Sequence, residues 1–542
     1  MPFLKTILDF GARGDGETND TASIQSAIDD AHASGGGTVV FPAGSYLSYT
    51  LHLRDGVTLH LEAGATLVAA YPDPDRKIGY DLPESSESGS KKYQDFGHSY
   101  FRNSLIYGEN LTNIAIIGFG AIDGRALRGA HHIDRVGDPP NPFQGPNHGK
   151  IDDFHDYELG EQPYFANKAI ALKNCRNVTL SDITLFRGGH FALLATGVDN
   201  LTIDRITVDT NRDALDIDCC RNVRITNCSI NSPFDDGIVL KTSYALNELR
   251  SCENITISDC LVSGYQVGSL IDGIYDRSFE KATDGDGPTG RIKIGTESNG
   301  DFRNIAITNC LFDHCRGLAL ETVDGATIED VVVSNITMRH IANSPFFLRL
   351  GNRARGPEGT PIGKLRRVSI SNVNVFDADS RYASQIVGEP GHEIEDIRFS
   401  NIRIHYRGGL SLEQVAQQDP SLVNPFFLRS DEPGVTGPRD PFHVPERPAA
   451  YPEPSMFGLL PAYALYIRHA RNVTFSDVSS SLLKEDARPA IMLDDAKGIE
   501  FRHCHFDRDR DAAPPIFSVN DSQFTTQETQ LVPFGHRDLD RR

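Results

Sequence analysis

The chain has 542 residues and a formal net charge of −21, because 74 aspartate and glutamate residues outweigh 53 lysine and arginine residues. Hydrophobic residues make up 39% of the chain, which is enough for a core and argues against disorder throughout. The acidic balance argues against a nucleic-acid partner, since phosphate backbones are bound by a surplus of lysine and arginine.

The sequence also bears on where the protein is located and on whether it binds a metal or a cofactor. No run approaches the roughly 20 apolar residues of a membrane span, so we predict no membrane partner. The start, MPFLKTILDFGARGDG, lacks the apolar segment of a secretory signal. We expect a cytoplasmic protein, or a periplasmic or secreted one from which a leader was removed. The nine cysteines lack metal-ligand spacing, so we predict no metal and no cofactor.

The first predicted element is a helix over residues 21–33. Apolar residues recur at helical spacing in Thr21–Ala33, after a polar, glycine-rich stretch. We expect this helix to cover the open N-terminal end of a β-sheet core, as part of a cap of about residues 1–45.

An eight-residue template then recurs along the chain: apolar, any, apolar, any, polar, apolar, any, apolar. Its first half alternates as a β-strand does. Its polar fifth position is usually Asn or Asp, which tolerate the left-handed conformation, so a tight corner between two short strands is predicted. Copies of the template lie at Val178–Leu185, Leu201–Val208, Val223–Ile230, Ile255–Val262, Ile305–Phe312, Val331–Met338, Val368–Val375, Ile397–Ile404 and Ile499–Phe506, with a looser copy from Val473.

The spacing of these copies predicts the fold class. The closest copies start 22, 23 and 26 residues apart, which suits one coil of a parallel β-helix. Successive coils would stack at roughly 4.8 Å and set equivalent residues in columns. We therefore predict an all-β chain, a single right-handed parallel β-helix domain over residues 1–542, with about ten or more coils.

Longer intervals between copies indicate loops inserted into the coils. Four stretches are rich in proline, glycine and charge, and lie near residues 71–105, 129–165, 263–290 and 406–462. Long loops on a rigid scaffold commonly form the walls of a binding cleft.

Four cysteines share the sixth template position, where other coils place isoleucine or valine. We expect them to form a buried core column rather than to act as ligands or nucleophiles. They are Cys228, Cys260, Cys310 and Cys504.

A cluster of carboxylates is predicted from two consecutive coils. Their alignment sets Asn211-Arg212-Asp213 beside Phe234-Asp235-Asp236. Asp213 then lies about one strand spacing from Asp236, with Asp235 at the same edge. Three carboxylates so close repel one another, and at least one should have a raised pKa, which lets one act as an acid while another stays ionised. An acidic solvated turn or an adventitious calcium site would use the same residue types.

Two segments resemble a known enzyme family. The run LDFGARGDGETNDTASIQSAID, followed by GGGTVVFPAGSYLSYTLHLRDGVTLHLEAGATL, resembles glycoside hydrolase family 28, the polygalacturonase family, and related pectin-acting β-helix enzymes. The later segment NRDALDID…SPFDDGIVLKT resembles that family's catalytic Asn-Thr-Asp and Gly-Asp-Asp motifs. The likeness covers most of residues 5–340. It implies inverting hydrolysis of a glycosidic bond in a pectic polysaccharide or oligosaccharide.

The resemblance also implies roles for individual residues. Asp235 would be the general acid that protonates the leaving oxygen, while Asp213 and Asp236 would hold the attacking water. In inverting sites the opposed carboxyl groups are roughly 6.5–9.5 Å apart. Lys241 matches the family's lysine after the acidic pair and is expected to bind substrate, as is Arg212.

Two positions depart from the family's pattern. The family's Gly-His-Gly aligns with Gly290-Arg291-Ile292, and its uronate-binding Arg-Ile-Lys aligns with Ala319-Leu320-Glu321. A carboxylate at Glu321 would repel galacturonate, which favours a neutral sugar such as rhamnose whose hydroxyls donate to Glu321. Alternatively, Arg291 or Lys293 binds a uronate from the neighbouring coil.

Histidines offer further candidates. His190 lies in the coil before NRDALDID, and we align it with Asp213, so it would contact sugar or pair with a carboxylate; otherwise it is an exposed histidine at the rim. His131, His132 and His148 lie in the 129–165 loop without metal-like spacing, so we take them as polar loop residues.

Three classes of function remain open. The first is an exo- or endo-acting hydrolase, and the long inserted loops favour exo action. The second is a polysaccharide lyase, for which Arg291 or Lys293 would supply the base. The third is a non-catalytic carbohydrate-binding or adhesin-like β-helix, because solenoids serve all three classes.

Overall fold

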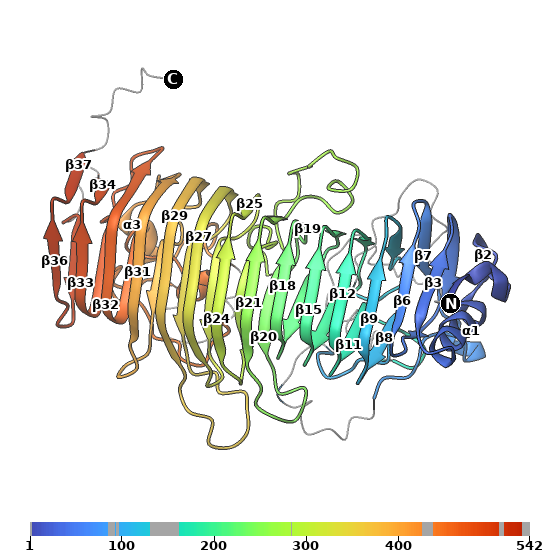
Figure 1. Ribbon diagram of the computed structural model, residues 1–542. Coiled ribbons are helices and arrows are strands. Elements are labelled where there is room, and N and C mark those ends of the chain that lie inside the picture. The colour runs from blue at the N-terminus through green and yellow to red at the C-terminus, as the bar shows by residue number, and fades with distance from the viewer. Residues whose placement is uncertain are drawn as a thin grey trace. The chain divides into compact units, whose positions relative to one another are not determined.

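The computed structural model describes residues 3–84, 93, 97–129, 162–282, 284–424, 437–508 and 514–533. The chain forms two compact units, Met1–Phe279 and Glu280–Arg542. In each unit, parallel strands stack coil upon coil, and the fold is the predicted right-handed parallel β-helix (Figure 1).

In the first unit the parallel pairings join the strands into three stacks. The first stack contains β5 (Leu51–His52), β8 (Ile106–Glu109), β11 (Lys168–Lys173), β14 (Phe191–Thr196), β17 (Asp213–Asp218) and β20 (Ile238–Thr242). The second contains β1 (Phe3–Thr6), β3 (Gly37–Phe41), β6 (Val57–Leu61), β9 (Thr112–Ile117), β12 (Arg176–Ser181), β15 (Asp199–Asp204), β18 (Arg221–Thr226) and β21 (Cys252–Ser258). The third contains β2 (Asp15–Asn19), β4 (Gly44–Ser48), β7 (Ala65–Ala69), β10 (Ala121–Asp123), β13 (Thr184–Phe186), β16 (Thr207–Asp209), β19 (Ser229–Asn231) and β22 (Leu261–Ser263).

The second unit repeats this plan with longer strands. Its first stack contains β23 (Ile292–Ser298), β26 (Leu318–Thr322), β28 (Phe346–Leu350), β30 (Ser384–Val387), β32 (Leu465–Leu482), β33 (Ile491–Arg502) and β35 (Ile516–Val519). The other two stacks use β24 (Phe302–Thr308), β25 (Leu311–Asp313), β27 (Thr327–Ile341), β29 (Lys364–Ala378), β31 (Ile394–Tyr406), β34 (His505–Arg508), β36 (Phe524–Gln527) and β37 (Gln530–Pro533), together with β32 and β33. The strands β27, β29, β31 and β32 therefore run through corners that separate two strands in the first unit.

Few helices accompany these strands among the described residues. The predicted helix is confirmed as α1 (Thr21–Ala33), which packs against η1 (Ile7–Phe10) and β3 and buries Ile24 and Ile28 completely. The others are η2 (Pro74–Arg76), α3 (Leu412–Gln417) and η5 (Pro454–Phe457). None of the described helices is long and apolar enough to span a membrane.

The corners between the second and third stacks follow the template. All seven Asn or Asp residues predicted at its fifth position have a positive φ, from +51° at Asn401 to +66° at Asp182. Side-chain amides also join equivalent corners of successive coils: Asn335 donates to Asn309 at 3.0 Å, and Asn372 donates to Asn335 at 3.1 Å. The corner residues therefore provide both the turn and a hydrogen bond between coils.

The sixth template position is part of the core, as predicted. Cys228, Cys260, Cys310 and Cys504 are each at most 2% exposed. All nine cysteines are buried and form no disulfide. Burial raises the pKa of thiols such as Cys504, which makes these sulfurs poor nucleophiles.

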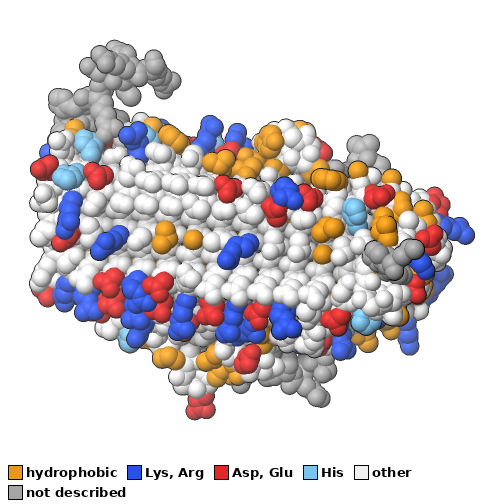
Figure 2. Space-filling view, viewed as in Figure 1, with side chains coloured by type: hydrophobic (Ala, Val, Ile, Leu, Met, Phe, Trp, Pro, Cys, Tyr) orange, Lys and Arg blue, Asp and Glu red, His pale blue; other side chains and the backbone are white. Residues whose placement is uncertain are grey.

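Each of the four predicted insertions comes directly before a strand of the first stack. They separate β7 from β8, β10 from β11, β22 from β23, and β31 from β32. On the face in Figure 2, basic and acidic side chains alternate along one edge instead of gathering in a patch of one sign. Ion pairs such as Arg367 Nε with Asp330 Oδ1, at 2.7 Å, account for such alternation.

Candidate functional site

The three predicted carboxylates come together in the first unit. Leu215 of β17 pairs with Ile238 of β20, and the Ala214 N–H donates to the Asp236 carbonyl at 3.1 Å. This register sets Asp213 beside Asp236, as the alignment of the two coils predicted. Asp213, Asp235 and Asp236 each offer a carboxylate oxygen within 4.8 Å of the others.

The surroundings of these carboxylates differ. The side chain of Asp235 is 25% exposed and forms an ion pair with Arg212 Nη2 at 2.7 Å, whereas Asp213 and Asp236 are only 4% and 3% exposed. Burial raises the pKa of the Asp213 carboxyl well above its usual value, and the negative charge of Asp235 raises it further. Burial therefore favours the protonated form of Asp213, while Asp235 is the member of the cluster that solvent reaches.

Lys241 lies beneath this cluster and is 5% exposed. Its Nζ is 2.7 Å from Asp216 Oδ2, 3.3 Å from Asp213 Oδ2 and 2.7 Å from His98 Nε2. The ammonium opposes the rise in the pKa of Asp213, because an adjacent positive charge favours the ionised carboxylate. Lys241 is predicted to bind substrate, and the structure shows its contacts with two carboxylates of the protein.

His98 and Asp216 were not identified in the sequence. Asp216 is completely buried in β17, and His98 is 3% exposed, in the insertion between β7 and β8. Asp216 and Asp218 alternate with the apolar Leu215 and Ile217 and so share one face of the strand, which was a usable signal for Asp216. His98 has no such signal, because an insertion has no periodicity that fixes its position.

His190 required a correction. The strand that pairs with β17 sets Phe191, and not His190, opposite Asp213. His190 is 1% exposed, so the alternative of an exposed histidine at the rim is wrong as well. Its ring packs edge-on against Phe191 with centroids 4.3 Å apart. Burial, together with the charge of Arg212, lowers the pKa of His190 well below its usual value.

Two groups of side chains in the described part of the first unit could hold a metal ion. The first group is the carboxylate cluster itself, Asp213 with Asp235 and Asp236, and the second is His98 with Asp213 and Asp216. In the second group, Lys241 already neutralises Asp213 and Asp216, so its ammonium would repel a metal cation there.

The remaining predicted binding residues lie in the second unit. Arg291 Nη2 is 2.5 Å from Glu453 Oε1 and 3.8 Å from Glu321 Oε1. Lys293 Nζ is 3.4 Å from Glu321 Oε2. These side chains are at most 6% exposed, and Arg291 and Lys293 neutralise glutamates of the protein.

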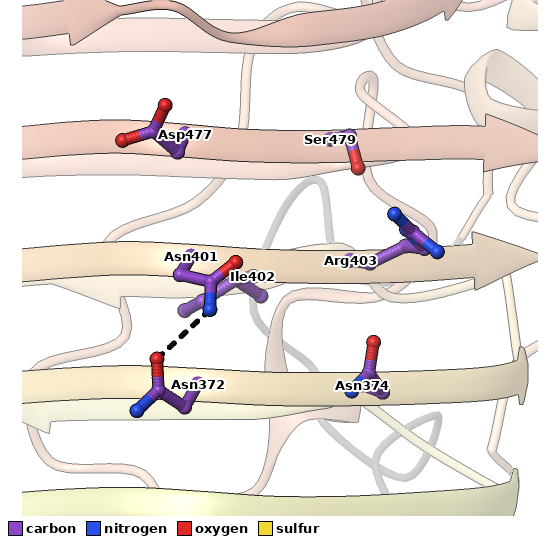
Figure 3. Close-up of a pocket in the computed structure, with 7 residues that line it drawn as sticks. All are labelled: Asn372, Asn374, Asn401, Ile402, Arg403, Asp477 and Ser479. Atoms are coloured by element: carbon purple, nitrogen blue, oxygen red, sulfur yellow. Dashed lines mark hydrogen bonds between the residues drawn. The ribbon is translucent and has the colours of Figure 1, made fainter.

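The second unit also carries a polar depression of about 130 Å³ between β29, β31 and β32 (Figure 3). Asn401 donates to Asn372 at its edge at 2.9 Å, so part of the lining belongs to the stacked corners. Its one carboxylate, Asp477, lacks the second carboxylate that acid–base hydrolysis needs. His131, His132 and His148 lie outside the described residues.

Two family models match the chain. One, described as "Rhamnogalacturonase A/epimerase, pectate lyase-like", matches residues 5–65. The other, described as "Right handed beta helix region", matches residues 163–275 and contains the carboxylate cluster.

Curated relatives extend the likeness over most of the chain. A probable polygalacturonase of Vitis vinifera is 24% identical over 410 residues, covering 68% of this chain and 74% of the relative. An exo-poly-alpha-D-galacturonosidase of Dickeya chrysanthemi is 25% identical over 462 residues, covering 78% of this chain and 70% of the relative. Over most of its length the chain is similar to these polygalacturonase relatives. The homology is distant, and it confirms the resemblance stated from the sequence motifs.

A solved structure supports the same fold. The family 28 exopolygalacturonase of Yersinia enterocolitica superposes with a TM-score of 0.61 at 18% identity, covering 95% of this chain and 79% of that chain. At this identity the likeness is evidence for the β-helix fold alone.

Proposed function

We propose that the chain is a glycoside hydrolase that cleaves a bond of a pectic polysaccharide or oligosaccharide. The observation that carries the proposal is the cluster of Asp213, Asp235 and Asp236, whose oxygens lie within 4.8 Å of one another. Paired carboxylates in different environments are what acid–base hydrolysis of a glycoside requires. The relatives from Vitis vinifera and Dickeya chrysanthemi, named as a polygalacturonase and a galacturonosidase, support the same class of substrate.

In this mechanism Asp235 donates the proton to the leaving oxygen. Its side chain is the exposed one of the three, and Arg212 holds one of its oxygens at 2.7 Å. Asp213 and Asp236 hold the attacking water between them. The raised pKa of Asp213 supports a proton that the cluster shares and that is available to Asp235 when substrate binds.

We propose inversion at the anomeric carbon, as the family resemblance implies. One oxygen of each carboxylate lies within 4.8 Å of the others, and inverting sites usually set the two opposed carboxyl groups roughly 6.5–9.5 Å apart. The anomeric configuration of the first product is therefore a strict test: an α-linked substrate should release a β-configured reducing end, and an α-configured product would contradict the mechanism.

A sugar residue of the substrate is proposed to be neutral, such as a rhamnose residue. Among the described residues, Lys293 and Arg291 already pair with Glu321 and Glu453, which lowers their attraction for a uronate. Exo action is proposed as well, because the insertion that carries His98 helps bury the cluster and suits the end of a chain better than its middle.

The decisive experiment compares the native chain with the Asp235→Asn variant on rhamnose-bearing pectic fragments, polygalacturonate and neutral aryl glycosides. We expect turnover on a rhamnose-bearing fragment and a loss of about 10²–10⁴-fold in the variant, since general acid catalysis contributes that much. Retained turnover in the variant would contradict the assignment of Asp235. Rapid release of galacturonate from polygalacturonate, abolished by Arg291→Ala, would contradict the neutral sugar.

A lyase mechanism is less well supported. Its base would be Arg291 or Lys293, and both are buried in ion pairs with glutamates. Products that absorb in the ultraviolet, together with loss of activity on chelation, would favour the lyase over the hydrolase.

A further inference from the structure

Tyr451 is an exposed aromatic ring held above the buried charges of the second unit. The residue is 41% exposed and lies in the insertion between β31 and β32, just before η5. Lys293 Nζ lies 5.6 Å from its ring centroid. Because the chain contains no tryptophan, stacking on a sugar depends on tyrosine, phenylalanine or histidine.

The position of this ring is fixed from two sides. Thr296 Oγ1 of β23 lies 3.3 Å from the Tyr451 hydroxyl. Two residues along the chain, Glu453 is held by Arg291 at 2.5 Å and by Arg316 at 2.9 Å. The segment is therefore tied to Thr296 of β23 by a hydrogen bond and to two arginines that lie just before β23 and β26 by ion pairs, so the ring loses little freedom when it binds a ligand.

Five arginine and lysine side chains of the described second unit, including Lys293 at the ring, each have a carboxylate partner within 4 Å. The pairs are Arg291 with Glu453, Lys293 with Glu321, Arg316 with Asp284, Arg353 with Asp324, and Arg355 with Glu297. A charged sugar would gain little from this surface, whereas the apolar C–H face of a neutral sugar ring can pack on the aromatic ring.

We propose that Tyr451 is a platform on which a neutral sugar residue packs its C–H face. The pectic origin of that sugar rests on the function proposed above, while the platform itself rests on the exposure and anchoring of Tyr451. The ring binds the sugar and takes no part in proton transfer, so it sets affinity and specificity.

The absence of tryptophan makes the site directly observable. In a Tyr451→Trp, Asp235→Asn double variant, the new indole is the chain's single tryptophan, and its emission reports binding without hydrolysis. We expect a saturable change on titration with a rhamnose-terminated pectic trisaccharide, and none with trigalacturonate at the same concentration. The matched control is Tyr275→Trp in the same background, because Tyr275 is 48% exposed in the insertion between β22 and β23. Its emission should not change.

Kinetics supply a second, independent test. Tyr451→Ala should raise KM for the rhamnose-bearing fragment about tenfold and leave kcat within about twofold, while Tyr451→Phe, which keeps the ring, should behave nearly as the native chain. An unchanged KM in Tyr451→Ala, or an equal emission response to trigalacturonate, would overturn the proposal. Sugar-dependent emission from the Tyr451→Trp variant, together with a native chain that hydrolyses nothing, would leave the platform intact and refute the proposed hydrolase.

Discussion

Asp213 is under electrostatic tension in the first unit. It is buried between the carboxylates of Asp235 and Asp236, with Lys241 as the nearest compensating charge. Its raised pKa means that the folded chain binds this proton more tightly than the unfolded chain does. The contribution to stability is therefore present below the ordinary pKa near 3.8, and is lost as the pH rises through the raised value.

Asp213→Asn should make stability less dependent on pH. Asparagine keeps the shape of the side chain but cannot ionise, so the fall in the free energy of unfolding from about pH 4 to pH 8 should be smaller than in the native chain. Denaturant titrations across this range measure the slope. The control is Asp272→Asn, at an exposed aspartate of an insertion, whose slope should match the native one. An unchanged slope in Asp213→Asn would contradict the tension described here.

Lys241→Met should shift the pH dependence of kcat/KM. Removing the ammonium takes away the charge that favours ionised Asp213, so the acid limb of the profile should move to higher pH. Lys173→Met is a suitable control, because Lys173 lies in the same stack and pairs with Glu109 at 3.1 Å, outside the carboxylate cluster. An acid limb that shifts equally in both variants, or in neither, would refute a specific link between Lys241 and Asp213.

The position of a single residue could be predicted from the sequence only where the pairing register of successive coils was predicted correctly. Asp213 and Asp236 were placed correctly because paired residues of their two coils are a constant 23 residues apart in sequence. His190 was misplaced by one residue, since the turn Arg187–His190 before β14 has four residues while the turn Thr210–Arg212 before β17 has three. His98 and Tyr451 come from insertions, where no repeat constrains the chain, and only the folded structure brings them to their sites.

At the scale of elements, stacked asparagines define the coil. Besides the template corner, the residue before each template forms its own ladder in the first unit: Asn200 donates to Asn177 at 2.9 Å, Asn222 to Asn200 at 3.2 Å, and Asn254 to Asn222 at 3.1 Å. Each of these residues has a positive φ near +57° to +60°. Asparagine suits this position because it accepts the left-handed conformation and its amide both donates and accepts.

Asn222→Ala and Asn222→Gly should separate the contribution of the side-chain hydrogen bonds to stability from that of the left-handed backbone conformation. Alanine loses two side-chain hydrogen bonds and is strained at φ +57°, for about 2–4 kcal/mol of stability in total. Glycine loses the bonds but adopts this φ freely, so it should cost about 1–2 kcal/mol. Denaturant unfolding measures both, and equal losses in the two variants would contradict a conformational role for the residue.

The template predicted corner positions better than strand lengths. All seven fifth-position Asn or Asp residues adopt a positive φ. The sequence pattern indicated short strands on both sides of each corner, yet β27 and β29 each run through the corner for 15 residues. β27 and β29 pair with each other both before and after the corner, so each remains one strand. The Asn or Asp side chain at the corner alone would predict that the strand ends there.

At the scale of the whole molecule, the repeat fixed the fold class, while the division of the chain remained a prediction. The sequence predicts one continuous β-helix domain over residues 1–542. If this is correct, thermal unfolding followed by far-ultraviolet circular dichroism and by tyrosine fluorescence should give coincident transitions. Two separated transitions, one for each compact unit, would contradict a single domain.

Analysis of the products of a defined reaction tests most directly the claim that the chain hydrolyses a glycosidic bond with inversion. The native chain and its Asp235→Asn variant are incubated with a rhamnose-terminated pectic oligosaccharide, and products are followed by mass and by anomeric configuration from the first turnovers. The account predicts a mass gain of one water across the products, inversion at the anomeric carbon, and a loss of about 10²–10⁴-fold in the variant. Unsaturated products without added water, a retained anomeric configuration, or an equally active variant would contradict it.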